Sequence, residues 1–236
     1  MIDDYGSVSY WDARYRTLAT QGATSSSSSG STDCYDWYLS FEDLKPFLLP
    51  HLRSKHMEIL YPGCGNSSLG YDLYNLGYHN VSNVDFSSAV IEQMCKRNLL
   101  GSGRARGMYD MDYAVMDARR LDSLPDRCFD LIVDKGLLDS LLCSDTNYDD
   151  VGLYVDEMRR VLAPGGCFLV VSHSPPNSRL SHLQGRERGG DDGTSWVVDH
   201  VSIPRTNTYA AKGSAAIAAT TSNSTCYYIY ACKKGI

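Results

Sequence analysis

The 236-residue sequence has no apolar run close to the roughly 20 residues that a membrane-spanning helix needs, so we expect no membrane association. Residues 1–5 include two aspartates and lack the basic and apolar regions of a secretory signal peptide, which favours a cytoplasmic location. Basic residues are also too few for a nucleic-acid-binding protein, because 22 lysines and arginines against 28 aspartates and glutamates leave a net charge of −6. A basic protein partner remains compatible with this charge.

Metal-binding and disulfide patterns are missing as well. Eight cysteines are present, but no two are spaced as Cys-x-x-Cys, and no two histidines are spaced as His-x-x-x-His. Cys95, Cys128 and Cys167 lie in or beside apolar segments, where a reduced cysteine packs as a small hydrophobic residue. We therefore expect reduced thiols and no metal site.

Two stretches have too little apolar content to build a core. Residues 24–32 consist of serine, threonine and glycine, and residues 206–225 are mostly small and polar, so we expect a flexible insertion and a mobile connection. A loop rich in glycine and arginine is expected over residues 177–195. The chain has the length of one α/β domain, which we divide into an N-terminal aromatic and helical segment, 1–57, and a main unit, 58–236.

What the sequence does contain is a strand, a glycine turn and a helix in direct succession. Residues 59–62 are mostly apolar, as in a buried strand, and the turn follows at Gly63 and Gly65. A helix with leucines on one face comes next and stops at Gly77. Asp85 follows the turn by about 20 positions, where a carboxylate can accept hydrogen bonds from both ribose hydroxyls. Because glycines also let a ligand approach the backbone closely, this stretch predicts a nucleotide-like ligand.

The remaining apolar runs predict the rest of a sheet. We expect strands over residues 81–85, 113–116, 129–133, 167–172, 196–203 and 226–232, and helices over residues 41–52, 69–76, 87–98 and 150–162. No helical pattern separates the last two strands, so they should form an antiparallel pair at the sheet edge. The expected fold class is α/β, with a doubly wound, mostly parallel seven-stranded sheet of the Rossmann-like type and an antiparallel C-terminal strand pair.

Glycines or aspartates follow four expected strands in succession. Gly63 and Gly65 follow the first strand, and Asp85, Asp117 and Asp134 end the next three. Ligands of doubly wound sheets bind outside the carboxyl ends of the strands, so these residues should meet at one site. Each aspartate alone also fits the role of a helix cap. Their common position at one edge of the sheet favours the ligand site.

Two aromatic clusters precede the first strand. Trp11 and Tyr15 are four residues apart, as on one helix face, and Tyr35 and Trp37 follow the serine-rich tract. One interpretation is a staple that fixes an N-terminal helix to the domain. The other is a lid whose rings cover a cationic ligand. Composition does not separate the two.

These patterns resemble the class I, seven-strand S-adenosylmethionine-dependent methyltransferases. The resemblance is closer to one branch, the protein-lysine methyltransferases that act on translation elongation factor one-alpha. Tyr61, two positions before Gly63, is a departure, because most methyltransferases carry an acid there, although this branch generally lacks it. The motifs of the branch appear as Tyr10-Trp11-Asp12-x-x-Tyr15, Tyr35-Asp36-Trp37-Tyr38, Pro62-Gly63-Cys64-Gly65-Asn66-Ser67, Val84-Asp85-Phe86-Ser87 and Asp134-Lys135-Gly136-x-x-Asp139.

The resemblance implies S-adenosylmethionine as cofactor and a role for each matched position. Trp11, Tyr15 and Trp37 would enclose the methionine end of the cofactor, which favours the lid interpretation. The other implied cofactor contacts are Gly63 and Gly65 in the turn beneath the ligand, Asp85 at the ribose, Phe86 against the adenine, Asp117 and Ala118 at the adenine amino group, and Lys135 beside the methyl group or the cofactor carboxylate.

A lysine acceptor must lose a proton before it attacks, since the pKa of its side chain in water is about 10.4. Asp134, Lys135 and Asp139 follow the fourth strand and are the candidate catalytic residues. Either acid serves as the proton acceptor or as a structural group. The sequence alone leaves that choice open.

Other classes of function also remain open. Residues 134–137 lack the Asn/Asp-Pro-Pro-Tyr/Phe pattern of amide and adenine-amino methyltransferases, which counts against those enzymes. Paired acids such as Asp134 and Asp139 also occur in polyamine synthases of the same fold. A small-molecule methyltransferase and a non-catalytic, cofactor-binding interaction domain are further alternatives. The favoured hypothesis is a monomeric methyltransferase with a lysine-presenting protein substrate.

Overall fold

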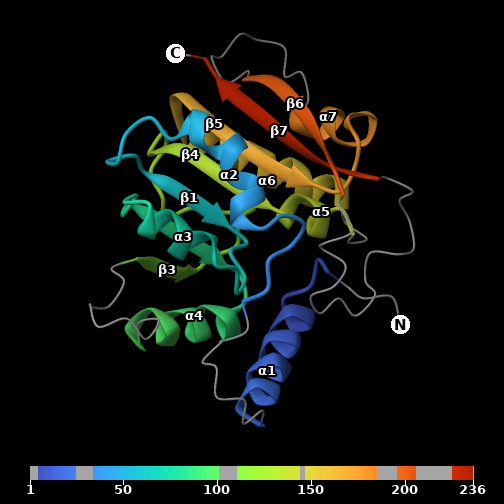
Figure 1. The fold of residues 1–236 in the computed structure, drawn as a ribbon. Coiled ribbons are helices and arrows are strands. Elements are labelled where there is room, and N and C mark those ends of the chain that lie inside the picture. Colours follow the sequence, from blue (N-terminus) through green and yellow to red (C-terminus); the bar gives the residue numbers. More distant parts are fainter. Residues whose placement is uncertain are drawn as a thin grey trace.

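A seven-stranded sheet forms the centre of the computed structural model, which describes residues 5–24, 34–100, 111–143, 147–184, 196–205 and 225–235 (Figure 1). Its spatial order is β3-β2-β1-β4-β5-β7-β6. β7 runs antiparallel to both of its neighbours, and the other pairings are parallel, which confirms the expected doubly wound α/β fold. The strands are β1 (Ile59–Pro62), β2 (Val81–Asp85), β3 (Asp112–Val115), β4 (Phe129–Lys135), β5 (Leu162–Ser172), β6 (Trp196–Pro204) and β7 (Cys226–Lys234).

The strand order reverses between β1 and β4. From β1 the chain moves outward through β2 and β3, and it then returns to pair β4 with the other side of β1. In an open α/β sheet, ligands bind in the crevice at this switch point, outside the carboxyl ends of the strands. The topology therefore places the candidate site around the turn that follows β1.

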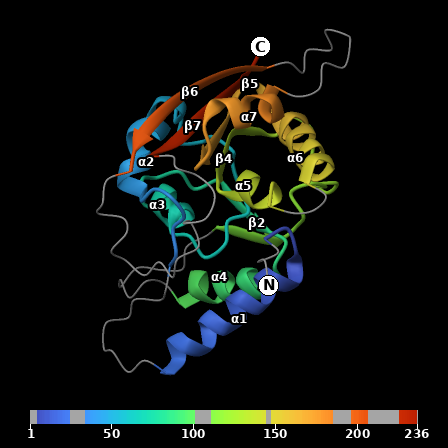
Figure 2. The same ribbon diagram turned by 90° about the vertical axis from the view of Figure 1, so that its right-hand side faces the viewer.

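Helices cover both faces of the sheet (Figure 2). One hydrophobic core packs α1, α2, α3 and α4 against the sheet, and a second core packs α5, α6 and α7 against the opposite face. Ile59 and Leu60 belong to different cores, because successive side chains of a strand point to opposite faces. The helices are α1 (Val8–Thr24), α2 (Phe41–Leu48), α3 (Leu69–Asn75), α4 (Ser88–Leu100), α5 (Leu137–Leu141), α6 (Asn147–Val161) and α7 (Pro176–Gln184).

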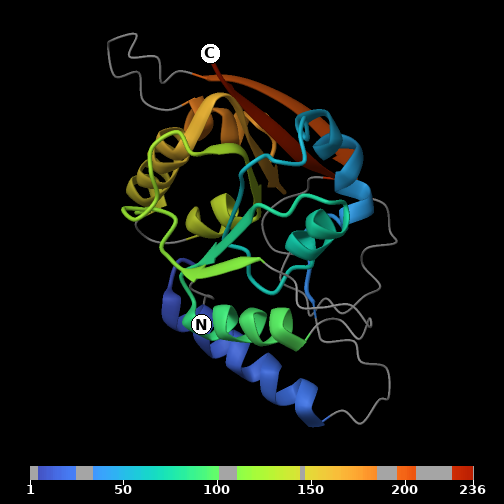
Figure 3. The ribbon, with the colours of Figure 1, turned by 90° about the vertical axis from the view of Figure 1, so that its left-hand side faces the viewer.

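The N-terminal segment packs onto the main unit. α1 lies along α4 (Figure 3), and the Asp12 carboxylate accepts hydrogen bonds from the Ser87 hydroxyl at 2.5 Å and from the Ala89 N–H at 3.3 Å. Trp11 and Tyr15 are buried in the same core as the α4 side chains. α1 is thus fixed at the start of α4, beside the carboxyl end of β2.

The loop predicted over residues 177–195 is wrong in its first part, since residues 176–184 form α7. The helix was missed because Arg179, one of its two buried residues, is charged, so the apolar pattern reduces to Leu180 and Leu183. The five-residue helix α5 was not predicted either. It is too short for a helical repeat of apolar residues to become visible.

Some predicted boundaries also shift. The helix expected over residues 41–52 ends as α2 at Leu48 and continues as a short 3₁₀ helix, Leu49–His51. Pro50 has no N–H with which to continue the α-helical hydrogen bonds. Residues 162–166, expected as a helix end and turn, instead open β5. There Leu162 pairs with Phe129 of β4 before the register shifts.

The serine-rich tract expected over residues 24–32 lies outside the described residues except for Thr24. Most of the connection expected over residues 206–225 lies outside them too. None of the helices in the described ranges is long and apolar enough to cross a membrane. In the same ranges, no group of three or more His, Cys, Asp or Glu side chains is arranged to hold a metal ion.

Candidate active site

The turn between β1 and α3 requires its two glycines. Gly63 has φ +60° and Gly65 has φ +51°, in the left-handed region that side chains other than glycine rarely adopt. A Cβ atom on Gly65 would lie 2.7 Å from the hydroxyl of Tyr15, and one on Gly63 would lie 3.0 Å from the Cβ of Leu137. The turn is thus enclosed by α1 on one side and by α5 on the other.

Asp85, the last residue of β2, is hydrogen-bonded to this turn. Its carboxylate accepts from the Gly65 N–H at 3.0 Å and from the Ser87 N–H at 2.9 Å. Burial raises the pKa of Asp85 to about 6, although these backbone N–H groups partly offset the effect. A carboxylate oxygen has more than one lone pair, so the group retains acceptor capacity for the hydroxyls of a ligand.

The aromatic residues predicted from the sequence lie together, with the Tyr15 hydroxyl beside the glycine turn. The Trp11 and Tyr15 rings stack with centroids 5.7 Å apart, and Trp37 meets Trp11 edge-on at 6.2 Å. The Trp11 indole N–H donates to the Tyr5 carbonyl at 2.7 Å, which fixes its ring plane. Because Trp11 and Tyr15 are also core residues, the cluster has the packing expected of a staple and the location expected of a lid.

Arg14, which the sequence analysis did not single out, adds a cation to this cluster. Its guanidinium carbon lies 5.8 Å from the ring centroid of Trp11 and 5.9 Å from those of Tyr35 and Trp37. These distances are within the range of cation–π attraction. Arg14 is therefore held beside the aromatic cluster by its ring faces.

Lys135 ends β4 and is buried in an ion pair with Asp36, another residue that the sequence analysis did not assign. The Asp36 carboxylate also accepts from the Ser67 hydroxyl and, at 3.0 Å, from the Ser68 hydroxyl. Burial lowers the pKa of Lys135, and the negative charge of Asp36 opposes that effect. The pair joins β4 to the Tyr35–Tyr38 motif and to the turn before α3.

Asp117 and Ala118 lie beyond the end of β3. The Asp117 carboxylate accepts from Nε of Arg119 at 2.9 Å and from its terminal nitrogen at 2.6 Å, and Arg119 also contacts Asp150 at 2.9 Å. Ala118 is buried in the second core. The backbone remains close to the site, because the Met116 N–H donates to the Asp85 carbonyl at 3.0 Å.

Asp134 has the contacts of a helix cap. Its carboxylate accepts from the N–H groups of Leu137 and Leu138 at 2.7 and 2.9 Å, and from the Tyr154 hydroxyl at 2.9 Å. The side chain is completely buried, and burial raises its pKa to about 7. These contacts match the structural role that the sequence left open for this residue, since they satisfy the first N–H groups of α5.

Asp139 is the centre of a buried polar cluster. Its carboxylate accepts from the Tyr38 hydroxyl at 2.9 Å, from the Ser172 hydroxyl at 2.6 Å and from Nε of Arg179 at 2.9 Å. It also accepts from the His173 N–H at 2.9 Å and lies 2.6 Å from His173 Nδ1. Burial opposes ionisation, but hydrogen bonding from His173 and the charge of Arg179 outweigh it and hold the pKa of Asp139 well below its usual value.

His173 and Arg179 were not identified from the sequence. His173 directly follows β5, and the rule that singled out the ends of the first four strands also applies to this fifth parallel strand. Arg179 left no signal, because it reaches Asp139 only through the packing of α7. The structure therefore brings Trp11, Tyr15, Trp37, the glycine turn and Asp85 into one group, with Phe86 packed against the same core.

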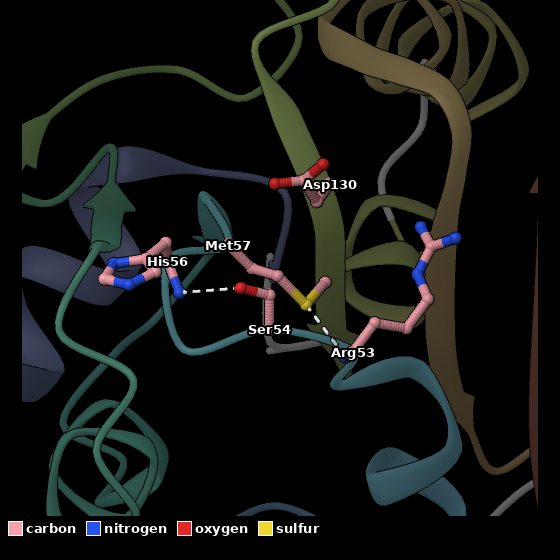
Figure 4. A pocket seen from close by; sticks show the side chains of 5 residues that line it. All are labelled: Arg53, Ser54, His56, Met57 and Asp130. Atoms are coloured by element: carbon pink, nitrogen blue, oxygen red, sulfur yellow. Dashed lines mark hydrogen bonds between the residues drawn. The ribbon is translucent and has the colours of Figure 1, made fainter.

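A separate shallow pocket lies at the other end of the sheet. Its lining residues come from the segment before β1 and from the start of β4, as Figure 4 shows. Ligands of this fold bind at the carboxyl ends of the strands, whereas this pocket lies at the amino ends. It is therefore not part of the candidate site. The pocket is lined by Arg53, Ser54, His56, Met57 and Asp130.

Comparison with known proteins identifies similar chains. A family model described as a methyltransferase domain matches residues 60–170. The chain is 34% identical over 208 residues to EEF1A lysine methyltransferase 4 of Bos taurus, a match that covers 84% of this chain and 71% of that protein. It is 32% identical over 186 residues to the protein of the same name from Mus musculus, covering 75% of this chain and 65% of the mouse protein. The chain thus spans slightly less than two thirds of the mouse relative.

A solved structure supports the fold at lower identity. The 1,6-didemethyltoxoflavin-N1-methyltransferase of Burkholderia thailandensis, with bound 1,6-didemethyltoxoflavin and S-adenosylhomocysteine, matches with a TM-score of 0.57 and 14% identity. The match covers 100% of this chain and 91% of that chain. A likeness at this level supports the architecture and leaves the substrate open.

Proposed function

The chain belongs to the S-adenosylmethionine-dependent methyltransferases, the family that includes EEF1A lysine methyltransferase 4, and we propose that it methylates a lysine side chain of a protein such as eEF1A. S-adenosylmethionine is the cofactor of this family and supplies a methyl group bound to a sulfonium sulfur. The observation that carries the proposal is the 34% identity to the bovine enzyme over 208 residues, which cover 84% of this chain.

The site fits the cofactor at several points. Gly63 and Gly65 both have positive φ angles, so the turn has the glycine conformation expected beneath a nucleotide-like ligand. Asp85 is suited to the ribose hydroxyls, and Phe86 beside it to one face of the adenine. We assign Asp117 and the Ala118 N–H to the adenine amino group, which requires Arg119 to share the Asp117 carboxylate.

The methionine end of the cofactor is assigned to the opposite side of the turn. There Trp11 stacks on Tyr15 and meets Trp37 edge-on, and a cation beside such ring faces is stabilised by the ring electrons. Lys135 is assigned to the cofactor carboxylate, which would share the ammonium group with Asp36. These residues bind and orient the cofactor, and the transfer itself needs an amine placed in line with the methyl group at roughly 3 Å.

The polyamine-synthase alternative is less well supported. It depends on two acids that are available to an amine substrate, whereas Asp134 caps α5 and Asp139 is surrounded by donors from the protein. A protein substrate fits an acidic chain, because eEF1A-type targets present basic lysine side chains. The net charge of −6 would favour their approach.

The proposal is tested by methyl transfer to a defined protein. Purified protein is incubated with labelled S-adenosylmethionine and either recombinant eEF1A or a cell lysate, and labelled bands are mapped by mass spectrometry. We expect label on a lysine side chain, and none when Asp85→Ala replaces the wild-type protein at low cofactor concentration. Label only in the small-molecule fraction, or on residues other than lysine, would contradict the proposal.

A further inference from the structure

We propose that His173 is the catalytic base that accepts the proton of the substrate amine, with Asp139 as its positioning residue. The inference deepens the proposed function and rests on it. His173 Nδ1 lies 2.6 Å from Asp139 and 3.2 Å from the Tyr38 hydroxyl. Because the ionised Asp139 carboxylate can only accept, Nδ1 carries the ring N–H and donates a hydrogen bond to Asp139.

This assignment leaves Nε2 as the unprotonated nitrogen of the neutral ring. Among the described residues no hydrogen bond is formed to Nε2, while both the backbone N–H and Nδ1 of His173 are used. The side chain is 29% exposed, whereas Asp139 is 3% exposed. A buried carboxylate behind a partly exposed imidazole is the arrangement that orients a histidine for proton transfer.

Asp139 is well suited to orient the ring and poorly suited to take the proton itself. The positively charged Arg179 donates from Nε to the Asp139 carboxylate at 2.9 Å, and the Ser172 hydroxyl donates to the same carboxylate at 2.6 Å. Both contacts favour the ionised carboxylate, and its pKa is accordingly far below the usual value. Protonation of Asp139 would weaken these hydrogen bonds and the ion pair with Arg179. Asp139 therefore acts in catalysis by orienting the ring of His173.

The position of His173 in the fold places it near the reacting groups. β4 and β5 are adjacent and parallel, with Lys135 paired to Val171, so His173 lies just beyond the same edge of the sheet as Lys135. Tyr38 connects the two regions, because its ring centroid is 5.8 Å from that of His173 and 6.1 Å from that of Trp37. One ring therefore separates the imidazole from the cluster assigned to the sulfonium.

The backbone of Tyr38 supports a functional role for this link. Its φ angle is +67°, an unfavourable value for a bulky side chain, and such strain tends to occur where function requires a special geometry. Here the unusual backbone directs the hydroxyl to both Asp139 and His173. Tyr38, with its strained backbone, thus holds its ring 5.8 Å from that of His173.

The proposed step balances in atoms and charge. Nε2 takes a proton from the lysine ammonium, which frees the lone pair on the amine nitrogen. That nitrogen then forms a bond to the methyl carbon as the carbon–sulfur bond breaks, and the electron pair of that bond stays on sulfur. The products are the methylated ammonium, the uncharged S-adenosylhomocysteine and an imidazolium, which returns its proton to water through its exposed edge.

The test must separate a base from a structural contact. His173→Asn keeps an N–H donor that can reach Asp139 but has no basic nitrogen, whereas His173→Ala removes both. His200→Ala is the matched control, since His200 lies on the outer edge strand β6 and takes no part in the site. For each protein we measure kcat with saturating eEF1A and cofactor, the Kd for S-adenosylhomocysteine and the melting temperature.

We expect both His173 variants to lose kcat by about 10²–10⁴-fold, with the cofactor Kd within a factor of three, and imidazole in the buffer to restore part of the activity of His173→Ala. His200→Ala should match the wild type. Retention of most of the wild-type kcat by His173→Asn would overturn the inference, as would a loss that imidazole does not restore in a folded His173→Ala. Failure of the proposed function is distinguishable, because the wild type would then not methylate eEF1A either.

Discussion

At the scale of single residues, Asp85 has the clearest expected effect. A hydrogen bond to a charged group contributes about 1.5–3 kcal/mol, so Asp85→Ala should weaken S-adenosylmethionine binding by roughly ten- to a hundredfold. The domain should stay folded, although the Gly65 and Ser87 N–H groups lose their acceptor. Calorimetric titration measures the affinity. An unchanged Kd would mean that Asp85 only stabilises the turn and does not bind the cofactor.

The raised pKa of Asp85 gives a second, independent prediction. With a pKa of about 6, the carboxylate is ionised at pH 7.5 and mostly protonated at pH 5.5. If the ionised form binds the ribose hydroxyls, affinity should fall about fourfold between these two values as pH decreases. Asp85→Asn should bind weakly at both pH values, and an identical pH dependence in that variant would assign the effect to another group.

The geometry around Gly65 favours glycine over any larger residue at this position. Gly65→Ala combines a strained φ of +51° with a collision against the Tyr15 hydroxyl, so we expect a loss of stability of about 1–3 kcal/mol and weaker cofactor binding. Tyr15→Phe in the same chain should restore part of the stability, because it removes the colliding oxygen but not the strain. The control is Gly152→Ala in α6, where a Cβ meets no atom within 4 Å and stability should stay equal or rise.

At the scale of elements, the contacts of α1 bear on whether the aromatic cluster is a structural staple or a lid over the cofactor. Its Asp12 accepts from Ser87 and from the first turn of α4, and these contacts position the helix beside the end of β2. Its Tyr15 hydroxyl lies beside Gly65 of the turn, and the Trp11 ring stacks on that of Tyr15. We therefore expect α1 to contribute both to stability and to cofactor binding.

Trp11→Ala separates the two contributions. Trp11 is 8% exposed, and its truncation should lower stability by about 3–5 kcal/mol through lost packing. In a lid it should also weaken S-adenosylmethionine binding more than S-adenosylhomocysteine binding, since cation–π attraction of about 0.5–2 kcal/mol needs the sulfonium charge. Titrations with both ligands, done well below the melting temperature, measure the difference.

A matched control comes from the other face of the sheet. Trp196 is also 8% exposed but lies in the second core, so Trp196→Ala should lower stability without changing either affinity. If Trp11→Ala weakened the binding of S-adenosylmethionine and of S-adenosylhomocysteine by the same factor, a role specific for the sulfonium charge would be excluded. Unchanged affinities with a lower melting temperature would leave the cluster as a staple only.

At the scale of the whole molecule, the cofactor should stabilise the fold. The candidate site joins α1, the turn after β1, the end of β2 and the end of β4, and these groups come together only in the folded chain. At a concentration of 100 times Kd, a ligand specific for the folded state adds about 2.7 kcal/mol. For a chain of this length the melting temperature should rise by roughly 5–10 °C.

Thermal unfolding with different ligands checks this expectation. S-adenosylmethionine and S-adenosylhomocysteine should both stabilise the protein, and NAD should have no effect. Asp85→Ala should show a smaller shift at the same ligand concentration. Stabilisation by NAD alone would contradict the cofactor assignment.

The sequence predicted the sheet well because parallel strands buried on both faces leave continuous apolar runs. β2 was predicted with its observed bounds, and the antiparallel C-terminal pair followed from the missing helical pattern between β6 and β7. Short elements were harder to predict, since α5 has only five residues and the apolar pattern of α7 reduces to Leu180 and Leu183, so neither shows a helical period. Residues 101–110, 185–195 and 206–224 lie outside the described chain, so the predictions there stay predictions.

By itself, the sequence determined the strand–glycine–helix succession and the positions of Gly63, Gly65, Asp85 and the aromatic motifs. Those features depend on neighbours in the chain, on periodicity and on backbone conformation, all of which are local. Only the tertiary structure decided that Asp139 meets His173 and Arg179, and that Lys135 pairs with Asp36. Such pairs join residues 34 to 99 positions apart, and their contact depends on which strands and helices pack side by side.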